Sequence, residues 1–131
     1  YLSFLDRNNF SYSLTEHVDE RGSFVEIIKT INSGQFSVST SAPGITRGNH
    51  YHDTKNEKFL VIKGDAVIRF RHVHDSEVIE YNVSERKLQV VDIPPGYTHN
   101  ITNTGEGEMI LVIWANEIFD RDNPDTFFLE V

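Results

Sequence analysis

Apolar and polar residues alternate with a period of two along most of this chain, and turn-forming residues separate the alternating runs. In one such run Phe36, Val38 and Thr40 alternate with three serines. The composition agrees, because Val and Ile contribute 12 residues each and Phe nine, whereas Ala contributes only 3. Branched and aromatic residues of these kinds suit the pleated, half-buried surface of a sheet. The pattern predicts an all-β domain, built as an antiparallel sandwich or barrel.

The expected strands lie near residues 23–31, 36–41, 58–63, 66–73, 77–83, 87–93, 98–103, 108–115 and 126–131. Gly, Pro, Asp and Ser residues fill the gaps, as turns require. Residues 1–15 are expected to form an N-terminal arm, whose apolar Tyr1–Leu5 segment we expect to exchange between two copies of a homodimer. Neither a linker nor a repeat divides residues 1–131, so we expect one domain. Because the chain begins with Tyr1 instead of Met, we interpret it as excised from a longer protein.

The composition also excludes several classes of function. The 131 residues include no Cys, so disulfides, iron–sulfur clusters and thiol nucleophiles are excluded, and any metal must be held by His and carboxylate side chains. The net charge of −8, without a basic run, argues against a nucleic-acid partner. No apolar stretch approaches the roughly 18 residues of a membrane helix. We therefore expect neither a nucleic acid nor a membrane as partner.

Four side chains with metal-ligating groups occur in two short blocks, GITRGNHYHDTKNEKFLVIKG and IPPGYTHNITN. His50 and His52 are two residues apart and would share one face of a strand, and Glu57 follows after a short turn. His99 begins another expected strand about 40 residues later. Neutral imidazoles with one carboxylate suit a divalent transition metal and leave coordination positions open. We expect these four residues to bind such an ion.

Nine residues in these blocks match, in type and spacing, the two metal motifs of the cupin superfamily. They are Gly44, His50, His52, Glu57 and Gly64 in the first motif and Pro94, Gly96, His99 and Asn103 in the second. Leu88 departs from the pattern, which usually has Gly there. The resemblance implies a small jelly-roll barrel with the metal in its mouth. It also favours zinc, although the ligands themselves accept iron, nickel or manganese as well.

A narrower resemblance concerns function. The segments HVDERGSFVEIIKT, ITRGNHYH and VVDIPPGYTHNI are similar to nucleotide-sugar 3,5-epimerases that act on 4-keto-6-deoxyhexoses. Nearly the whole chain resembles the C-terminal cupin domain of the CapF-type capsular-polysaccharide assembling enzymes. This resemblance implies C3 epimerisation of a UDP-linked 4-keto-6-deoxy-N-acetylhexosamine in the cytoplasm. A short-chain dehydrogenase-like N-terminal domain, absent from this chain, would then reduce the product with NADPH.

Epimerisation next to a ketone requires a base, a group that stabilises the enolate oxygen and an acid. In metal-free epimerases the His that matches His50 is the base, but we assign His50 to the metal because His52, Glu57 and His99 complete a ligand set. The base stays open among Lys58, Tyr51, Tyr97 and Glu26; we name Lys58 and Tyr97 as catalytic candidates.

The resemblance further implies that Arg21 and Arg47 bind the diphosphate, with Phe24 and Glu26 as further substrate-binding residues. Two other functions remain open at this level. One is a metal-dependent oxygenase or isomerase acting on a small molecule. The other is a non-catalytic module that binds a sugar nucleotide or holds a dimer together.

Overall fold

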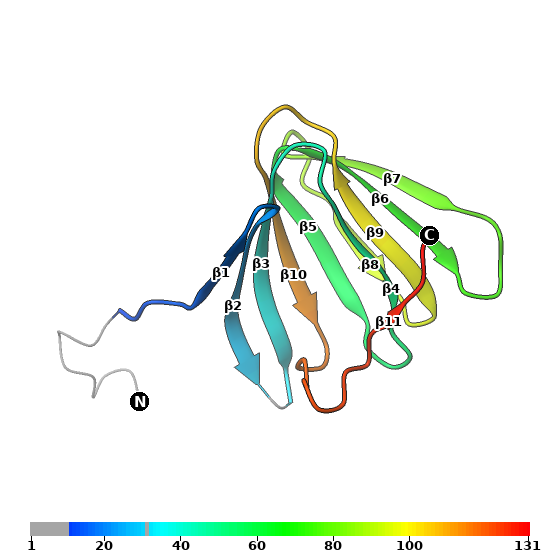
Figure 1. The fold of residues 1–131 in the computed structure, drawn as a ribbon, viewed down its shortest axis with the longest axis horizontal. Helices are drawn as coiled ribbons and strands as arrows, with labels where there is room; N and C mark the ends of the chain where they lie inside the picture. Colours follow the sequence, from blue (N-terminus) through cyan, green and yellow to red (C-terminus); the bar gives the residue numbers. More distant parts are fainter. Residues whose placement is uncertain (1–10, 31) are drawn as a thin grey trace.

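The computed structural model describes residues 11–30 and 32–131, and within these residues all regular structure consists of antiparallel strands (Figure 1). The strands are β1 (Glu16–Asp19), β2 (Gly22–Thr30), β3 (Gly34–Ser41), β4 (Thr46–Tyr51), β5 (Glu57–Lys63), β6 (Asp65–His72), β7 (Ile79–Ser84), β8 (Val90–Ile93), β9 (Tyr97–Asn103), β10 (Met109–Ala115) and β11 (Phe127–Phe128). The predicted all-β class is confirmed. The expected exchange of Tyr1–Leu5 lies outside the described residues.

Two sheets face each other and enclose the interior (Figure 1). The six-stranded sheet has the order β1-β2-β3-β10-β5-β8, and the five-stranded sheet has the order β11-β4-β9-β6-β7. Strands that are neighbours in a sheet are often distant in sequence, as in a jelly roll. The pairing of β11 with β4 places Phe128 opposite His50, so the C-terminal segment closes the edge nearest the His-rich block. No helix in the described part of the chain is long and apolar enough to cross a membrane.

Two strands lie outside the expected ranges: β4, which was expected only in that His50 and His52 would share a strand face, and β1, whose sequence gives no apolar signal. The Glu16–Asp19 segment is exposed along its whole length, and in the structure it forms β1 by pairing with β2. Gly22 makes this hairpin possible: its φ is 148°, and an added Cβ would lie 2.1 Å from the carbonyl oxygen of Thr40. A strand at the edge of the larger sheet therefore follows directly after the predicted N-terminal arm of residues 1–15.

The interior is apolar in one part and polar in another. A cluster of buried apolar side chains fills the first part: Phe59, Val61, Ala66, Ile68, Phe70, Val83, Val91, Ile93, Ile101, Met109 and Leu111. On β3, by contrast, the buried inward positions are Gln35, Ser37, Ser39 and Ser41. These small polar side chains leave space between the sheets, and the candidate site occupies that space.

Candidate metal centre and substrate cavity

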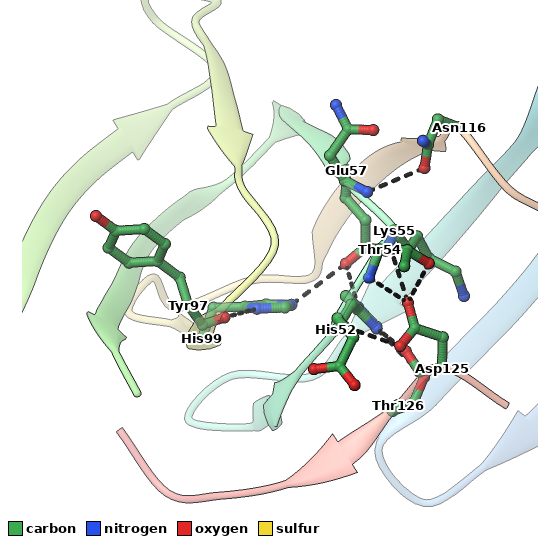
Figure 2. A network of polar contacts seen from close by, with 11 residues as sticks. His52, Thr54, Lys55, Glu57, Tyr97, His99, Asn116, Asp125 and Thr126 are labelled. Atoms are coloured by element: carbon green, nitrogen blue, oxygen red, sulfur yellow. Dashed lines mark hydrogen bonds and ion pairs between the residues drawn. The ribbon is translucent and has the colours of Figure 1, made fainter. Parts of the chain in front are cut away.

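The structure brings His50, His52, Glu57 and His99 together from three strands and one turn. Figure 2 shows three of the four, His52, Glu57 and His99. Each of the four residues offers one ligating atom, and these four atoms all lie within 4.8 Å of one another. The ring centroids of His50 and His99 are 4.8 Å apart, and that of His52 lies 5.2 Å and 5.5 Å from them. Three imidazoles and one carboxylate thus surround a single point, as the spacing predicted.

A bulge in β4 sets the position of His50. The pairing of β4 with β9 shifts between Gly48 and His50, which places His50 directly opposite His99. Two adjacent residues adopt positive φ at the bulge, Gly48 at 108° and Asn49 at 60°. A side chain at position 48 would put its Cβ 2.6 Å from the His99 carbonyl oxygen, so only Gly fits there.

Main-chain carbonyl groups fix the ring orientation of two of the histidines. His99 Nδ1 lies 3.1 Å from the carbonyl oxygen of Tyr97, and His52 Nδ1 contacts the carbonyl oxygen of Asp125 (Figure 2). Because a carbonyl oxygen only accepts hydrogen bonds, each Nδ1 is the donor. Nε2 of both rings is then directed to Glu57, whose Oε1 lies 2.9 Å from His52 Nε2 and 3.3 Å from His99 Nε2. Such outer hydrogen bonds are typical of metal-binding histidines.

The electrostatics of the group favour a cation at its centre. Burial, aided by His99 and His52, lowers the pKa of His50 to about 4, so this imidazole is a neutral ligand. Burial opposes charge on His52, but its hydrogen bond to Glu57 and the Glu57 charge raise its pKa. Burial likewise opposes charge on Glu57, yet the two neighbouring histidines lower the pKa of this carboxyl group. His52 and the buried carboxylate of Glu57 share a proton, and a metal ion would replace that proton.

A further observation supports a divalent transition metal as the ion that these four side chains would bind. His99 Nε2 is buried and has no hydrogen-bond partner among the described residues. Buried polar atoms are nearly always paired, so an unpaired nitrogen directed at a carboxylate and two imidazoles indicates a missing ligand. Imidazole and carboxylate ligands suit zinc and other first-row ions.

Asp125 holds the metal-binding turn in place, a role that the sequence analysis did not predict. Its carboxylate accepts hydrogen bonds from the main-chain N–H groups of Asp53, Thr54 and Lys55, at 2.8 to 2.9 Å. These donors outweigh the effect of burial and lower the pKa of Asp125 to about 2. The strand β4 ends at Tyr51, so His52 lies in the turn and not on the predicted strand. The C-terminal segment therefore positions His52.

We expect Asp125→Ala to weaken metal binding about 10- to 100-fold, the usual effect of losing an outer partner of a ligand. The turn after His52 would lose three hydrogen bonds, and the ring would no longer be held against the ion. Competition with a chromophoric chelator measures this affinity. Asp122→Ala, which alters an exposed carboxylate of the same loop, is the control. Equal affinities of the two variants would contradict the role of Asp125.

A cavity of about 540 Å³ opens beside the metal group. Arg21, Phe24, Glu26 and Arg47, the four predicted substrate-binding residues, all line it. The register between β2 and β3 explains two of them: Phe24 is opposite Ser39 and Glu26 is opposite Ser37. Because both serines are buried and face inward, their partners on β2 share that face.

The two arginines are held differently. Arg47 donates from Nε to Ser41 Oγ at 2.9 Å and from a terminal nitrogen to the Thr40 carbonyl oxygen at 3.0 Å. Burial and the nearby Arg21 lower the pKa of Arg47. Arg21 forms a two-point interaction with Asp19, at 2.6 and 3.1 Å. Arg47 thus has its remaining donors available to a ligand, whereas Arg21 is already engaged.

The structure does not bring Lys58, Tyr97 or Tyr51 to the cavity. Lys58 alternates with inward-facing Glu57 on β5, so it points outward and pairs with Asp92 at 2.6 Å. The ring of Tyr97 packs against Phe70 and His72, and the ring of Tyr51 packs against Phe127. Of the four base candidates, only Glu26 lines the cavity.

Comparison with known proteins agrees with this geometry. Residues 17–127 match the family described as the polysaccharide biosynthesis C-terminal domain. The chain belongs to this family. It is 51% identical over 131 residues to the UDP-2-acetamido-2,6-beta-L-arabino-hexul-4-ose reductase of Pseudomonas aeruginosa, spanning 100% of this chain and 35% of that protein.

The fold places this polysaccharide biosynthesis C-terminal domain among the cupins of the CapF type. The crystal structure of the capsular polysaccharide assembling protein CapF from Staphylococcus aureus superposes with a TM-score of 0.94 and 62% identity, covering 99% of this chain and 38% of that one. An oxalate decarboxylase of Bacillus subtilis shares the fold at a TM-score of 0.69 and 21% identity, over 88% of this chain and 30% of that one. The chain thus spans little more than a third of the length of its close relatives. As a member of this family, it has a role in polysaccharide biosynthesis.

Proposed function

We propose that this domain epimerises C3 of a UDP-linked 4-keto-6-deoxy-N-acetylhexosamine, with a divalent ion, zinc by family resemblance, as cofactor. An N-terminal dehydrogenase-like domain of the longer protein would then reduce the C4 ketone with NADPH in the cytoplasm. The observation that carries the proposal is one shared cavity: the His and Glu ligands, Glu26 and Arg47 all line it.

The proposed reaction requires one proton to leave C3 and another to return from the opposite face. The C3–H bond breaks, its proton goes to a carboxylate oxygen of Glu26, and its electron pair forms the C3–C4 double bond of an enolate. An ion held by His50, His52, Glu57 and His99 would supply Lewis-acid polarisation of the ketone oxygen. Inward-facing Ser37 and Ser39 leave room for a sugar ring beside Glu26.

Solvent deuterium exchange tests this function. We expect NMR to show deuterium at C3 of a UDP-4-keto-6-deoxy-N-acetylhexosamine incubated with the metal-loaded protein in D₂O. Chelation should abolish the exchange and added zinc should restore it. The absence of exchange in metal-loaded protein would contradict the proposal and favour a binding role for this domain.

We assign diphosphate binding to Arg47. Its hydrogen bonds to Ser41 and Thr40 leave part of the guanidinium group free to bind a ligand. We expect Arg47→Met to weaken UDP binding about 10-fold or more, because a charge-assisted hydrogen bond to phosphate is lost. Isothermal titration with UDP measures the effect. Arg86→Met, at an exposed turn, is the control. Undiminished UDP affinity in Arg47→Met would instead favour a small-molecule substrate without a diphosphate.

A further inference from the structure

Lys55 is a buried lysine in the wall of the cavity. Only 6% of its surface is exposed, although lysine is among the residues that are rarely buried without an ionic partner. Its main-chain N–H donates to the Asp125 carboxylate at 2.9 Å, which fixes the turn that carries it (Figure 2). Its side chain lines the same cavity as the metal group.

The ammonium group of Lys55 has no anionic partner in the part of the chain that the structure describes. The ion pairs of the other lysines and arginines there are made at exposed positions, as between Lys58 and Asp92. Lys55 Nζ lies over the ring of Phe119, 5.6 Å from its centroid. A cation–π contact of this length offsets little of the cost of burying a charge.

The position of Lys55 separates it from the arginines. Phe119 donates its main-chain N–H to Gln35 at the start of β3, whereas Arg47 contacts Ser41 at the end of that strand. Six residues of extended strand span about 20 Å. The ammonium group of Lys55 and the guanidinium group of Arg47 therefore lie near opposite ends of the cavity wall. Lys55 itself lies in the turn between two of the metal ligands, His52 and Glu57, so the metal group is beside this end of the wall.

A purely structural role does not explain the residue. A Met at position 55 would cover Phe119 with a similar volume and would carry no desolvation cost. A lysine that is nine-tenths buried, has no ionic partner among the described residues and lines a cavity instead indicates a ligand that brings the negative charge. The chemistry that an ammonium group recognises as a point charge is an oxyanion.

We propose that Lys55 Nζ binds an oxyanion beside the metal centre, at the end of the cavity opposite Arg47. This inference rests on the proposed function in one respect: in that reaction the oxyanion is the C4 oxygen of the sugar, which becomes negative when C3 loses its proton. Lys55 would then hold the enolate oxygen by a charge-assisted hydrogen bond. The site takes planar carboxylates or enolates in preference to neutral sugars.

Oxalate, a planar dianion, is a suitable probe. We expect isothermal titration of the metal-loaded protein to show oxalate binding that weakens about 10- to 100-fold in Lys55→Met, since one charge-assisted hydrogen bond is lost. Lys87→Met, at an exposed turn, should bind oxalate as the unmodified protein does. Equal oxalate affinity in Lys55→Met, with unchanged metal stoichiometry, would overturn the proposal.

A second measurement avoids any variant. The ¹³Cε resonance of Lys55 in the unmodified protein should shift on addition of oxalate, and an unchanged resonance at saturation would overturn the proposal even if Lys55→Met failed to fold. Deuterium exchange then separates the two inferences. Exchange that is equal in Lys55→Met and the unmodified protein contradicts the role of Lys55 alone. Absent exchange in the unmodified protein, with the oxalate result intact, contradicts the epimerase function alone.

Discussion

Replacing His99 by Gln is expected to weaken divalent metal binding by at least about 100-fold. Loss of an outer partner of a ligand already costs 10- to 100-fold, and loss of the ligand itself costs more. His99 is 1% exposed, and its Nε2 is directed at the other ligands, with Glu57 Oε1 3.3 Å away, so the substitution removes a ligand from the centre of the group. Competition with a chromophoric chelator gives the affinity directly.

Thermal unfolding provides an independent readout of the same change. An ion at 100 times its dissociation constant stabilises the folded state by about 2.7 kcal/mol. The unmodified protein should therefore melt at a higher temperature with zinc than without it, and His99→Gln should show little of this gain. His74→Gln, in the exposed hairpin after β6, is the matched control. A zinc-dependent gain that survives in His99→Gln would show that the ion binds elsewhere.

Replacing Glu26 by Gln is expected to slow deuterium exchange at C3 about 10²- to 10⁴-fold, the usual contribution of a positioned proton acceptor. The amide keeps the size of the side chain but cannot take the proton. Glu26 forms an ion pair with Lys29 at 3.1 Å, and because both side chains are partly exposed, its loss should change stability by less than about 1 kcal/mol.

The control for this variant is Glu85→Gln, at an exposed turn after β7. UDP binding should stay within a few-fold of the unmodified value in both variants, because Arg47 is unchanged. Full exchange activity in Glu26→Gln would remove Glu26 as the base, while the metal dependence of the exchange would still test the wider function.

Much of the fold was predictable because alternation is a local property. Each predicted strand has a counterpart in the structure, since branched and aromatic residues at every second position require a sheet with one buried face. β1 was missed because Glu16–Asp19 is exposed on every side chain and has no apolar face to detect. Its formation depends on the edge of β2 and on the turn at Gly22.

The candidate site was predictable in part. The types and spacing of the four ligands identified them, and the structure brings them together. The outward direction of Lys58 followed from the same alternation, because its neighbour Glu57 had already been assigned inward. Asp125 and Lys55 were missed for different reasons. Asp125 contacts a turn about 70 residues earlier, and a Lys between polar neighbours gives no sign of burial.

The sequence by itself determined the class of fold and the types of the ligands, because alternation and motif spacing are read from residues within a few positions of one another. The bulge at Gly48 and Asn49 depends on the pairing of β4 with β9. The tertiary structure decided which nitrogen of His52 and His99 faces the ion, because that choice depends on carbonyl groups that the folded chain places beside each ring. It also decided that the side chain of Lys55 is buried without an ionic partner among the described residues. Burial is a property of the packed chain, and only packing converts an ordinary turn lysine into a charge that requires a ligand.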